Sequence, residues 1–496
     1  MRKLKFIIII SILSISTYAQ NRKKIEIINA DYTYVNNDLH PDYWRLIGNV
    51  NIRHNNTDML CDSAYYYSNQ ERIKAFNNIK IYRGDSINLY GDALNYNGKD
   101  NIAVISRNVI FKNNKNTLKS EEIIFNIKED HAFYNTRSEI INLKQKIISN
   151  KGEYDIHSKI YNFTDSVIVK TKDYLIKTNY LKYDTDSERN YIQGPSNIYI
   201  EDKIIYCENG FFDSSSNKAE FYKNSKIFSN EYSVYADSIF YNNKTKYAIA
   251  KSNVKLIDSI NNFVLLGGVA EFYENDDKLI VYNNPLLKLF SDEDTLFMSS
   301  TKFINSTIGE KRYLTSYNNV KFLNNELKGK CDSLIYKITD SLILMYNNPI
   351  IWFDEYQVTS DNISISYYNK VINRIYLSPK PMIISKEDSS EFNQIKGKEM
   401  IGYFKKNKLY NLNVNGNGQS IYFLKDKDKK IGMNYIESSN ISLNFRDNKI
   451  HKINYEIAPH SITTPLEDIK EKNKFLKGFK WRINEKPMDK KDIIIG

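Results

Sequence analysis

Apolar and polar residues alternate along most of this chain, in short runs that are separated by turn residues. In Gly48-Asn49-Val50-Asn51-Ile52 and in Val320-Lys321-Phe322, every second position is β-branched or aromatic. Successive side chains of a β-strand point to opposite faces, so a period of two is typical of strands with one buried face. The 3.6-residue spacing of an amphipathic helix is nearly absent between residues 44 and 455. The pattern therefore predicts an all-β fold.

The alternating runs recur at a regular interval. Each copy opens on an acidic or polar step followed by apolar residues, as in Asp62-Ser63-Ala64-Tyr65 and again in Asp332-Ser333-Leu334-Ile335. Ten such steps lead from Asp62 to Asp361, which gives a mean repeat of about thirty residues. A unit of this size cannot bury its own apolar face, so successive units must stack. We expect an elongated sheet, or a pair of facing sheets, built from about twelve or thirteen repeats.

The second half of each repeat carries an Asn-apolar-x-apolar step, with Pro after the Asn in variants at Asn284 and Asn348. Asn supplies a positive-φ turn, and the two apolar residues that follow share one face of the strand. Stacking would align these faces into one apolar stripe, which forms either an open trough for an apolar ligand or a closed core. The residues predicted to form the stripe are Val50, Ile52, Ile79, Ile81, Val109, Phe111, Val254, Leu256, Val320, Phe322, Ile350 and Trp352.

The first residues have the composition of a cleavable export signal. Arg2, Lys3 and Lys5 precede an apolar run of about ten residues, which is too short to span a bilayer. A small-x-small cleavage site follows at Thr17-Tyr18-Ala19. No later run approaches the ~18 apolar residues that a transmembrane helix needs. We therefore expect a periplasmic protein, and association with the outer membrane stays open.

The C-terminal residues differ from the repeats. Thr464 precedes Pro465, which suits a helix N-cap followed by Pro at the first turn, so a short helix is expected as far as Phe475. Residues from Lys486 onward are expected to form a loose tail. The predicted organisation is a signal peptide over 1–19, a repeat array over 20–455 with a loop insertion or break near 378–397, and a C-terminal capping segment over 456–496.

A stack of strands ends in exposed edges, which are sticky unless they are covered. The C-terminal segment could lie over the last strands and cap that edge. The N-terminal edge, from Ile25 to Val35, alternates Ile and Tyr and has no comparable cover. We expect a jellyroll partner or a second copy to add its strand there, unless the loop over 36–43 covers the edge.

Motifs for catalysis and metal binding are missing from the sequence. The six His residues have no i, i+4 spacing, no Cys pair has zinc-ribbon spacing, and no nucleophile elbow, phosphate-binding loop or dinucleotide fingerprint occurs. The Asp-Ser steps recur with the fold, whereas a nucleophile is needed once, so we assign them to turns and strand edges. The sequence predicts a protein without catalysis, metal or other cofactor. Cross-strand carboxylate pairs, which a polysaccharide-cleaving solenoid would need, stay open.

The net charge of the chain indicates which classes of ligand it can attract. The formal net charge is +11, and three of these charges lie in the predicted signal. A positive chain attracts anionic lipid or sugar phosphates, but no basic cluster indicates nucleic-acid binding.

The three cysteines, Cys61, Cys207 and Cys331, begin similar short sequences in separate repeats. Equivalent positions lie far apart along a stack, so we expect buried thiols rather than disulfides.

Five stretches contain the most typical steps of the repeat, Gly48-Asn49-Val50-Asn51-Ile52, Cys61-Asp62-Ser63-Ala64-Tyr65-Tyr66, Lys74-Ala75-Phe76-Asn77-Asn78-Ile79, Ala236-Asp237-Ser238-Ile239-Phe240-Tyr241 and Ala248-Ile249-Ala250-Lys251-Ser252-Asn253-Val254. These steps resemble those of the OstA-like family of lipopolysaccharide transport, and in particular its long Bacteroidetes members. The resemblance implies a V-shaped β-jellyroll whose open trough binds the acyl chains of lipid A, so the apolar stripe would be lipid-binding. It also implies lipopolysaccharide, other jellyroll components of the transport bridge or outer-membrane translocon, and head-to-tail self-association as partners. An envelope polysaccharide-binding or polysaccharide-cleaving β-solenoid is the alternative.

Overall fold

The computed structural model describes residues 24–36, 42–84, 87–113, 115–291, 294–368, 371–426, 429–446 and 449–493. The predicted signal peptide and most of the predicted covering loop over 36–43 lie outside these residues. The described residues confirm an all-β chain of stacked antiparallel strands. They divide into two compact units. The first extends to Lys172 and includes Asn179–Asp186, and the second contains Asp173–Thr178 and the residues from Ser187 onward.

The first unit begins with two short strands and continues in long ones, apart from the short strands β9 to β12. One strand, β14 (Leu175–Asp184), belongs to both units. Its residues up to Thr178 are part of the second unit, and those from Asn179 onward are part of the first. The strands before it are β1 (Glu26–Asn29), β2 (Tyr32–Tyr34), β3 (Trp44–His54), β4 (Thr57–Tyr67), β5 (Arg72–Arg83), β6 (Ile87–Asn97), β7 (Ile102–Asn113), β8 (Asn116–Asn126), β9 (His131–Tyr134), β10 (Ser138–Ile141), β11 (Gln145–Ser149), β12 (Lys151–Asp155) and β13 (Ile160–Thr171).

The second unit repeats the same plan, with some strands split in two. Its strands are β15 (Arg189–Ile200), β16 (Lys203–Asp213), β17 (Lys218–Phe228), β18 (Tyr232–Asn242), β19 (Tyr247–Asp258), β20 (Phe263–Tyr273), β21 (Lys278–Tyr282), β22 (Leu286–Phe290), β23 (Thr295–Ser299), β24 (Lys302–Ile308), β25 (Lys311–Leu323), β26 (Leu327–Lys337), β27 (Leu342–Tyr346), β28 (Ile350–Phe353), β29 (Tyr356–Thr359), β30 (Asn362–Tyr368), β31 (Val371–Leu377), β32 (Met382–Lys386), β33 (Phe392–Lys396), β34 (Glu399–Lys405), β35 (Lys408–Asp426), β36 (Lys429–Arg446), β37 (Lys449–Glu456) and β38 (His460–Pro465).

Many long strands bend near the middle, at the Asn step of the repeat. In β3, Gly48 and Asn49 have φ of 75° and 42°, and these two residues oppose the single residue Asp62 of β4. One extra residue at positive φ is a β-bulge that turns the strand. The bend divides each unit into two walls that meet at a corner. Wall A holds the strand halves that end at turns such as η1 (Ser68–Gln70), and wall B holds those that end at turns such as Asn55-Asn56.

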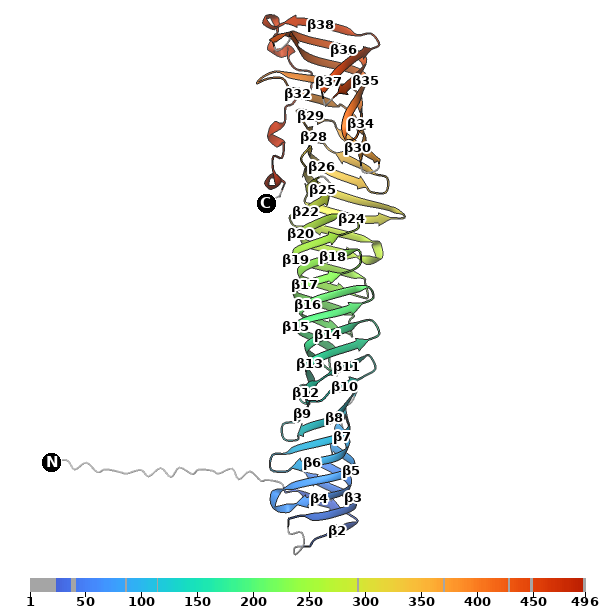
Figure 1. Cartoon of the computed structure of the whole chain (residues 1–496), viewed down its shortest axis with the longest axis vertical. Coiled ribbons are helices and arrows are strands. Elements are labelled where there is room, and N and C mark those ends of the chain that lie inside the picture. The colour runs from blue at the N-terminus through green and yellow to red at the C-terminus, as the bar shows by residue number, and fades with distance from the viewer. Residues whose placement is uncertain are drawn as a thin grey trace, which may run out of the picture. The chain divides into compact units, whose positions relative to one another are not determined.

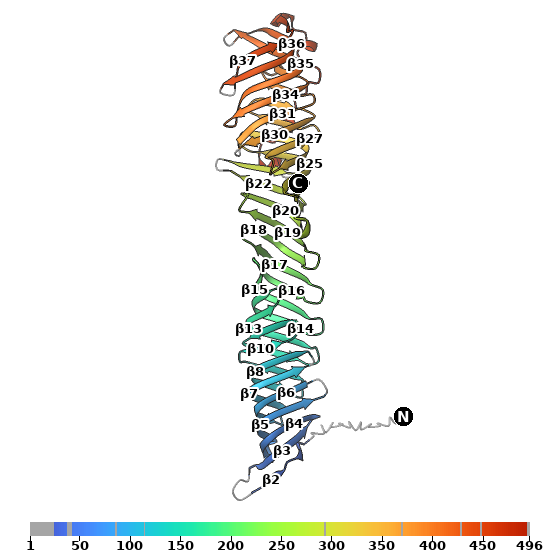
Figure 2. The ribbon, with the colours of Figure 1, turned by 90° about the vertical axis from the view of Figure 1, so that its right-hand side faces the viewer.

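The figures show the two walls in the second unit. In Figure 1, β24 and β30 of wall A lie on the right, and β22 and β28 of wall B lie on the left. Figure 2, turned by 90°, shows the strands slanting across the stack. Side-chain bonds from Asn to the facing carboxylate support the corner at 2.7–3.4 Å, in the pairs Asn49–Asp31, Asn78–Asp62, Asn108–Asp92, Asn224–Glu208, Asn253–Asp237, Asn347–Asp332 and Asn415–Glu399.

The core lies between the walls. Directly paired residues of wall B form what we call the inner ladder. In the first unit its members are at most 2% exposed, and Phe111 meets Tyr154 of wall A with ring centroids 5.8 Å apart. These members are Ile52, Met59, Ile81, Leu89, Phe111, Leu118, Ile140, Ile147 and Val169. In the second unit they are Ile205, Ile227, Val234, Leu256, Leu265, Leu287, Met298, Phe322, Gly329, Ile351, Val358 and Ile383.

The C-terminal segment departs from the sequence prediction. The described residues contain no α-helix after Pro465 and instead form short 3₁₀ turns, η3 (Leu466–Asp468), η4 (Glu471–Asn473), η5 (Ile483–Glu485) and η6 (Lys490–Asp492). Ile469 and Lys470 have extended ψ angles, which interrupt any helix. The expected loose tail is packed at Ile493, which is 0% exposed and accepts a hydrogen bond from Ser299 Oγ.

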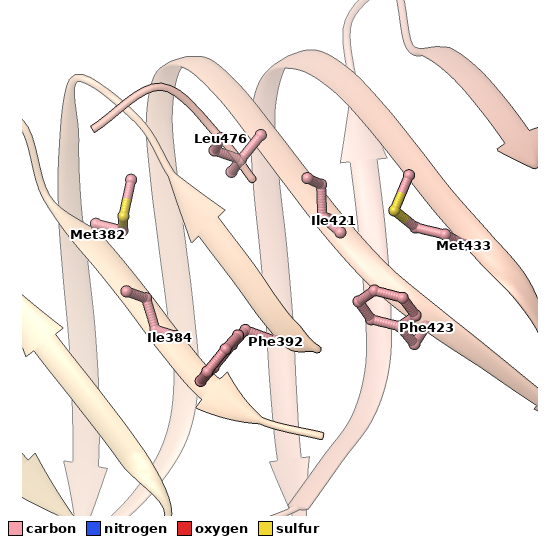
Figure 3. Packing of buried hydrophobic residues seen from close by; sticks show 7 residues of the cluster. All are labelled: Met382, Ile384, Phe392, Ile421, Phe423, Met433 and Leu476. Carbon is pink, nitrogen blue, oxygen red and sulfur yellow. The ribbon is translucent and has the colours of Figure 1, made fainter. Parts of the chain in front are cut away.

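We call residues 466–493 the strap. It runs along the outer face of wall B (Figure 1), rather than pairing with the edge strand β38. Figure 3 shows Leu476 of the strap above Met382, Ile384 and Phe392, in a cluster that also contains Ile421, Phe423 and Met433. Strand pairing continues through 378–397, where β29 pairs with β32 and β31 pairs with β34.

Candidate functional site

Ten of the twelve stripe residues lie on the inner face of wall B. Six belong to the first unit and are at most 1% exposed, and four belong to the second and are at most 5% exposed. They are therefore packed between the walls. The ten are Val50, Ile52, Ile79, Ile81, Val109, Phe111, Val254, Leu256, Val320 and Phe322.

Ile350 and Trp352 lie on the opposite face. Ile350 pairs with Lys330 and Trp352 with Lys328, and both lysines contact the strap. The residue on the inner ladder is Ile351. Pro349 takes the first position after the Asn in this variant, so the inner-facing residues are shifted by one relative to the predicted pair.

The free margin, at the end of each wall away from the corner, is polar in the first unit. His54 Nδ1 of wall B and the Tyr96 hydroxyl of wall A are hydrogen-bonded, and both residues are buried. Asn55 Nδ2 donates to Asn101 Oδ1 at 2.5 Å. Arg83 forms an ion pair with Asp130. These cross-wall bonds, which we call the polar margin, close the first unit opposite its corner.

The free margin of the second unit is mostly apolar between residues 263 and 353, although the half-buried Asn324 interrupts it on wall B. Leu289 lies two residues after Leu287 on β22, so it shares the inner face and is nearer to the margin. It pairs with Phe263 and Leu296. These side chains are only partly buried, whereas the corresponding His54 and Asn113 of the first unit are buried. We call the whole set the apolar margin. Its members are Phe263, Leu289, Leu296, Leu327 and Phe353 on wall B, and Phe272, Leu279, Leu314, Tyr336 and Ile343 on wall A, all of them half-buried.

The sequence prediction missed the apolar margin, although a signal is present. The third position of the alternating run is His54, Arg83 or Asn113 in the first unit. In the second unit it is Leu289 and Phe353 in two repeats but Asp258 and Asn324 in two others. Extending the Asn-apolar-x-apolar step by one alternation would therefore have identified Leu289 and Phe353 as unusual, without separating the two units. An ion pair between Lys203 Nζ and Glu274 Oε1, at 3.0 Å, joins the walls of the second unit at one end of this apolar stretch.

A small cavity continues the inner face beyond Tyr356. Its volume is about 20 Å³, room for about one water molecule. Apolar and tyrosine residues line most of it, including Ile383 of wall B and Ile453 and Tyr455 of wall A, together with the uncharged polar residues Ser385, Asn393 and Ser420. Burial raises the pKa of Tyr356 to about 12, so its hydroxyl stays neutral at physiological pH. The lining of this cavity therefore carries no charge.

A second hollow, of about 710 Å³, lies on the outer side of the corner at Asn283-Asn284. Its lining is polar and contains one carboxylate, Glu271, which accepts hydrogen bonds from Tyr273 at 2.6 Å and Tyr282 at 2.7 Å. Acid–base cleavage of a glycosidic bond uses two carboxyl groups. The lining does not supply such a pair.

The described residues offer little further chemistry. No three His, Cys, Asp or Glu side chains within the described ranges gather into a group that could hold a metal ion. Burial, with a smaller contribution from the neighbouring carboxylate, raises the pKa of Cys61, Cys207 and Cys331 to about 12, so these free thiols stay protonated. Among the same residues, no helix has the length and apolar character needed to cross a membrane.

Comparison with known proteins gives a family match over residues that belong almost entirely to the first unit. Residues 22–179 match the model of a family described as OstA-like protein. This match includes the polar margin and ends before the apolar margin. No curated protein matches the chain.

Proposed function

Over residues 22–179 the chain is a member of the OstA-like family, a transport and binding family of the lipopolysaccharide-transport type, and from this premise we propose that it is a non-catalytic lipid-binding protein. Its ligand is the acyl portion of an envelope lipid, with lipid A of lipopolysaccharide as the cargo. The apolar margin of the second unit is the place where the chains bind. In this proposal the protein acts in the periplasm, where the family is typically found, as part of the bridge that serves outer-membrane assembly.

The observation that carries the proposal is the contrast between the two margins. Half-buried Leu289, Leu296 and Phe353 present apolar surface beside the inner ladder. Each methylene that an acyl chain buries against such surface contributes about 0.8 kcal/mol. A chain of a dozen carbons therefore gains enough to offset its loss of conformational freedom. The same position in the first unit is filled by bonded polar groups, which have no such affinity.

The inner ladder lies directly behind the apolar margin. Leu256 and Phe322, among the ten predicted stripe residues on this face, are at most 5% exposed. A chain seated at the margin would reach them only if the walls separate locally. We propose that the four of these residues in the second unit, Val254, Leu256, Val320 and Phe322, form the floor of the site and that the margin residues make the first contact. A net charge of +11 favours the approach of an anionic headgroup.

Partners follow from the same proposal. Jellyroll components of the transport bridge or of the outer-membrane translocon would receive or deliver the lipid, and a second copy of the chain could stack end to end. Among the described residues, the edge strands available for this are β1 and β2, which pair only with β3, and β37 and β38, which pair only with β36. Polysaccharide binding is the alternative, and the polar hollow around Glu271 is where it would occur.

Lipid extraction tests the proposal. The full-length protein is purified from cells that make lipopolysaccharide, and the bound lipid is quantified by mass spectrometry. The variant Leu289→Gln with Leu296→Gln changes a directly paired couple of the apolar margin. The matched control is Ile257→Gln with Val264→Gln, another directly paired and half-buried couple of wall B, on the outer face.

We expect lipid A species in the wild type and the control, and at least a tenfold loss in the margin variant. The absence of acyl lipid from all three proteins would contradict the proposal, as would an equal loss in the two variants. Recovery of polysaccharide alone would favour the alternative.

A further inference from the structure

Two buried glutamines on the outer face of wall B hold the backbone of the strap. Gln394 Nε2 donates to Lys474 O at 2.7 Å, and its Oε1 accepts from Leu476 N at 2.8 Å. Gln357 repeats the arrangement six residues further on, donating to Lys480 O and accepting from Arg482 N, both at 2.7 Å. Each amide bonds a carbonyl and an N–H two residues apart, as a neighbouring extended strand would. Both glutamines are 0% exposed.

Lysines extend this contact along the strap. Lys396 Nζ donates to Lys477 O at 3.3 Å, Lys328 Nζ to Met488 O at 3.1 Å, and Lys321 Nζ to Asp492 O at 2.9 Å. Backbone carbonyls occur in every polypeptide. These contacts therefore recognise an extended chain with little regard to its side chains.

Side chains anchor the strap at few points. Leu476 and Ile493 are 5% and 0% exposed, and the partly buried rings of Phe479 and Trp481 each lie 5.1 Å from that of Phe392. By contrast, Phe475 and Ile483 are 37% and 38% exposed and Met488 is 68% exposed. One side-chain ion pair, between Glu485 Oε2 and Lys330 Nζ at 2.7 Å, joins the strap to β26. Burial of apolar surface is the main source of binding free energy, so a segment with few buried side chains is readily exchanged.

The face beneath the strap also holds an unsatisfied donor. Trp352, which pairs with Gln357, is 1% exposed, and its indole Nε1 has no hydrogen-bond partner among the described residues. A buried N–H without an acceptor is unfavourable. The strap therefore does not fully satisfy the surface that it covers.

From these observations we propose that the outer face of wall B from β25 to β33 is a polypeptide-binding track, and that the strap is its displaceable occupant. The partner is an extended segment of another protein. It presents an apolar side chain where Leu476 lies and free backbone N–H groups where Leu476 and Arg482 lie. This inference is independent of lipid binding, which concerns the inner face.

Exchange of a labelled peptide tests the track in the full chain. A specific protease site is placed in the exposed turns between Pro465 and Lys474, the folded protein is cleaved there, and the strap stays bound without covalent attachment. A fluorescent peptide with the sequence of residues 470–493 is then added, and its binding is followed by anisotropy. We expect the peptide to replace the strap below the unfolding temperature.

Two peptide variants separate backbone recognition from side-chain recognition. Leu476→Pro with Arg482→Pro removes the two backbone N–H groups that donate to the glutamine side chains. This double change should weaken competition by the peptide at least tenfold. A peptide that keeps Leu476, Phe479 and Trp481 but has Ser at the other positions should still compete. On the protein side, Gln394→Leu should speed release of the peptide, whereas Gln193→Leu, at an exposed position of β15, should not.

A peptide that enters only when the whole unit unfolds would overturn the proposal, because the strap would then be an integral part of the fold. Equal competition by the proline peptide would also overturn it, because the hydrogen bonds from the strap backbone to Gln394 and Gln357 would then contribute nothing to binding.

Discussion

Asn78 of β5 donates a hydrogen bond from Nδ2 to Oδ2 of Asp62 in β4, at 2.8 Å. The two residues belong to the two motifs of the repeat, the Asn step and the Asp-Ser step. Asn78 has φ of 50°, in the left-handed region that Asn tolerates better than most residues. The bond thus joins the residue that makes the bend to the residue that faces it across the bulge. Equivalent pairs recur along the corner, which explains why both motifs share one period.

Replacing Asn78 should destabilise the first unit through the backbone as well as the bond. For Asn78→Ala we expect a loss of about 1–2 kcal/mol, because Ala is disfavoured at positive φ and cannot bond Asp62. Asn78→Gly keeps the bend and should cost less. Urea unfolding followed by circular dichroism checks the order, with Asn95→Ala at an exposed position of β6 as the control. Equal midpoints for Asn78→Ala and Asn78→Gly would show that the left-handed backbone is not strained there.

The polar margin should stabilise the first unit selectively. Arg83 pairs with Asp130 and also donates to Asn55 O at 3.1 Å and Thr57 Oγ1 at 3.2 Å. Arg83→Met leaves these partly buried acceptors unpaired, at a cost of about 1–3 kcal/mol. Hydrogen exchange should become faster in the first unit and stay unchanged beyond residue 187. Arg72→Met, at an exposed position of the same strand, is the matched control. Uniform acceleration along the chain would argue against a local closure.

The three thiols should be unreactive in the folded protein. Burial raises the pKa of Cys61, Cys207 and Cys331 to about 12, so almost no thiolate forms at pH 8. A disulfide-exchange reagent should label none of them in buffer and all three in denaturant. An exposed Asn95→Cys variant gives the rate for a free thiol. Fast labelling of the native wild type would place at least one cysteine in an accessible site.

The N-terminal edge is a candidate for association between jellyrolls. β1 and β2 pair with β3 alone among the described strands, and Tyr32 and Tyr34 are 64% and 58% exposed. Proline at position 27 or 34 removes a backbone donor from this edge and should weaken association with a partner or a second copy. Light scattering and partner co-purification measure the effect, and the circular dichroism of distant repeats should not change. Normal assembly of both variants would place the docking edge elsewhere.

The strand array could be predicted because its signals are local. Period-two alternation fixes the buried face, and Asn at positive φ fixes the bends, so Val50-Asn51-Ile52 contains most of the information about its own strand. The prediction failed locally at Ile350 and Trp352. Ile351 stands three residues after Asn348, as Ile52 does after Asn49, so the phase of the strand is unchanged. Pro349 occupies the first position after the Asn, and counting the apolar pair from Ile350 instead placed both side chains on the wrong face.

The strap could not be predicted because distant residues decide its conformation. Thr464-Pro465 carries helix-start chemistry, but β38 includes both residues, and Gln394 takes the N–H of Leu476 that a helix would use internally. Gln394 lies some eighty residues earlier in the chain. Whether a margin is open or closed likewise depends on the side chains of two facing walls, which are far apart in the sequence. For this reason the sequence alone does not decide between an open trough and a closed core.

The central claim is that acyl chains contact the apolar margin of the second unit. The most direct measurement is in-cell photo-crosslinking with a photoreactive residue at Leu289, compared with one at Ile257 on the outer face of the same wall. Our account predicts that lipopolysaccharide is captured at Leu289 and not at Ile257. Capture at neither position, or equal capture at both, while the two proteins are produced at the same level and remain folded, would contradict it.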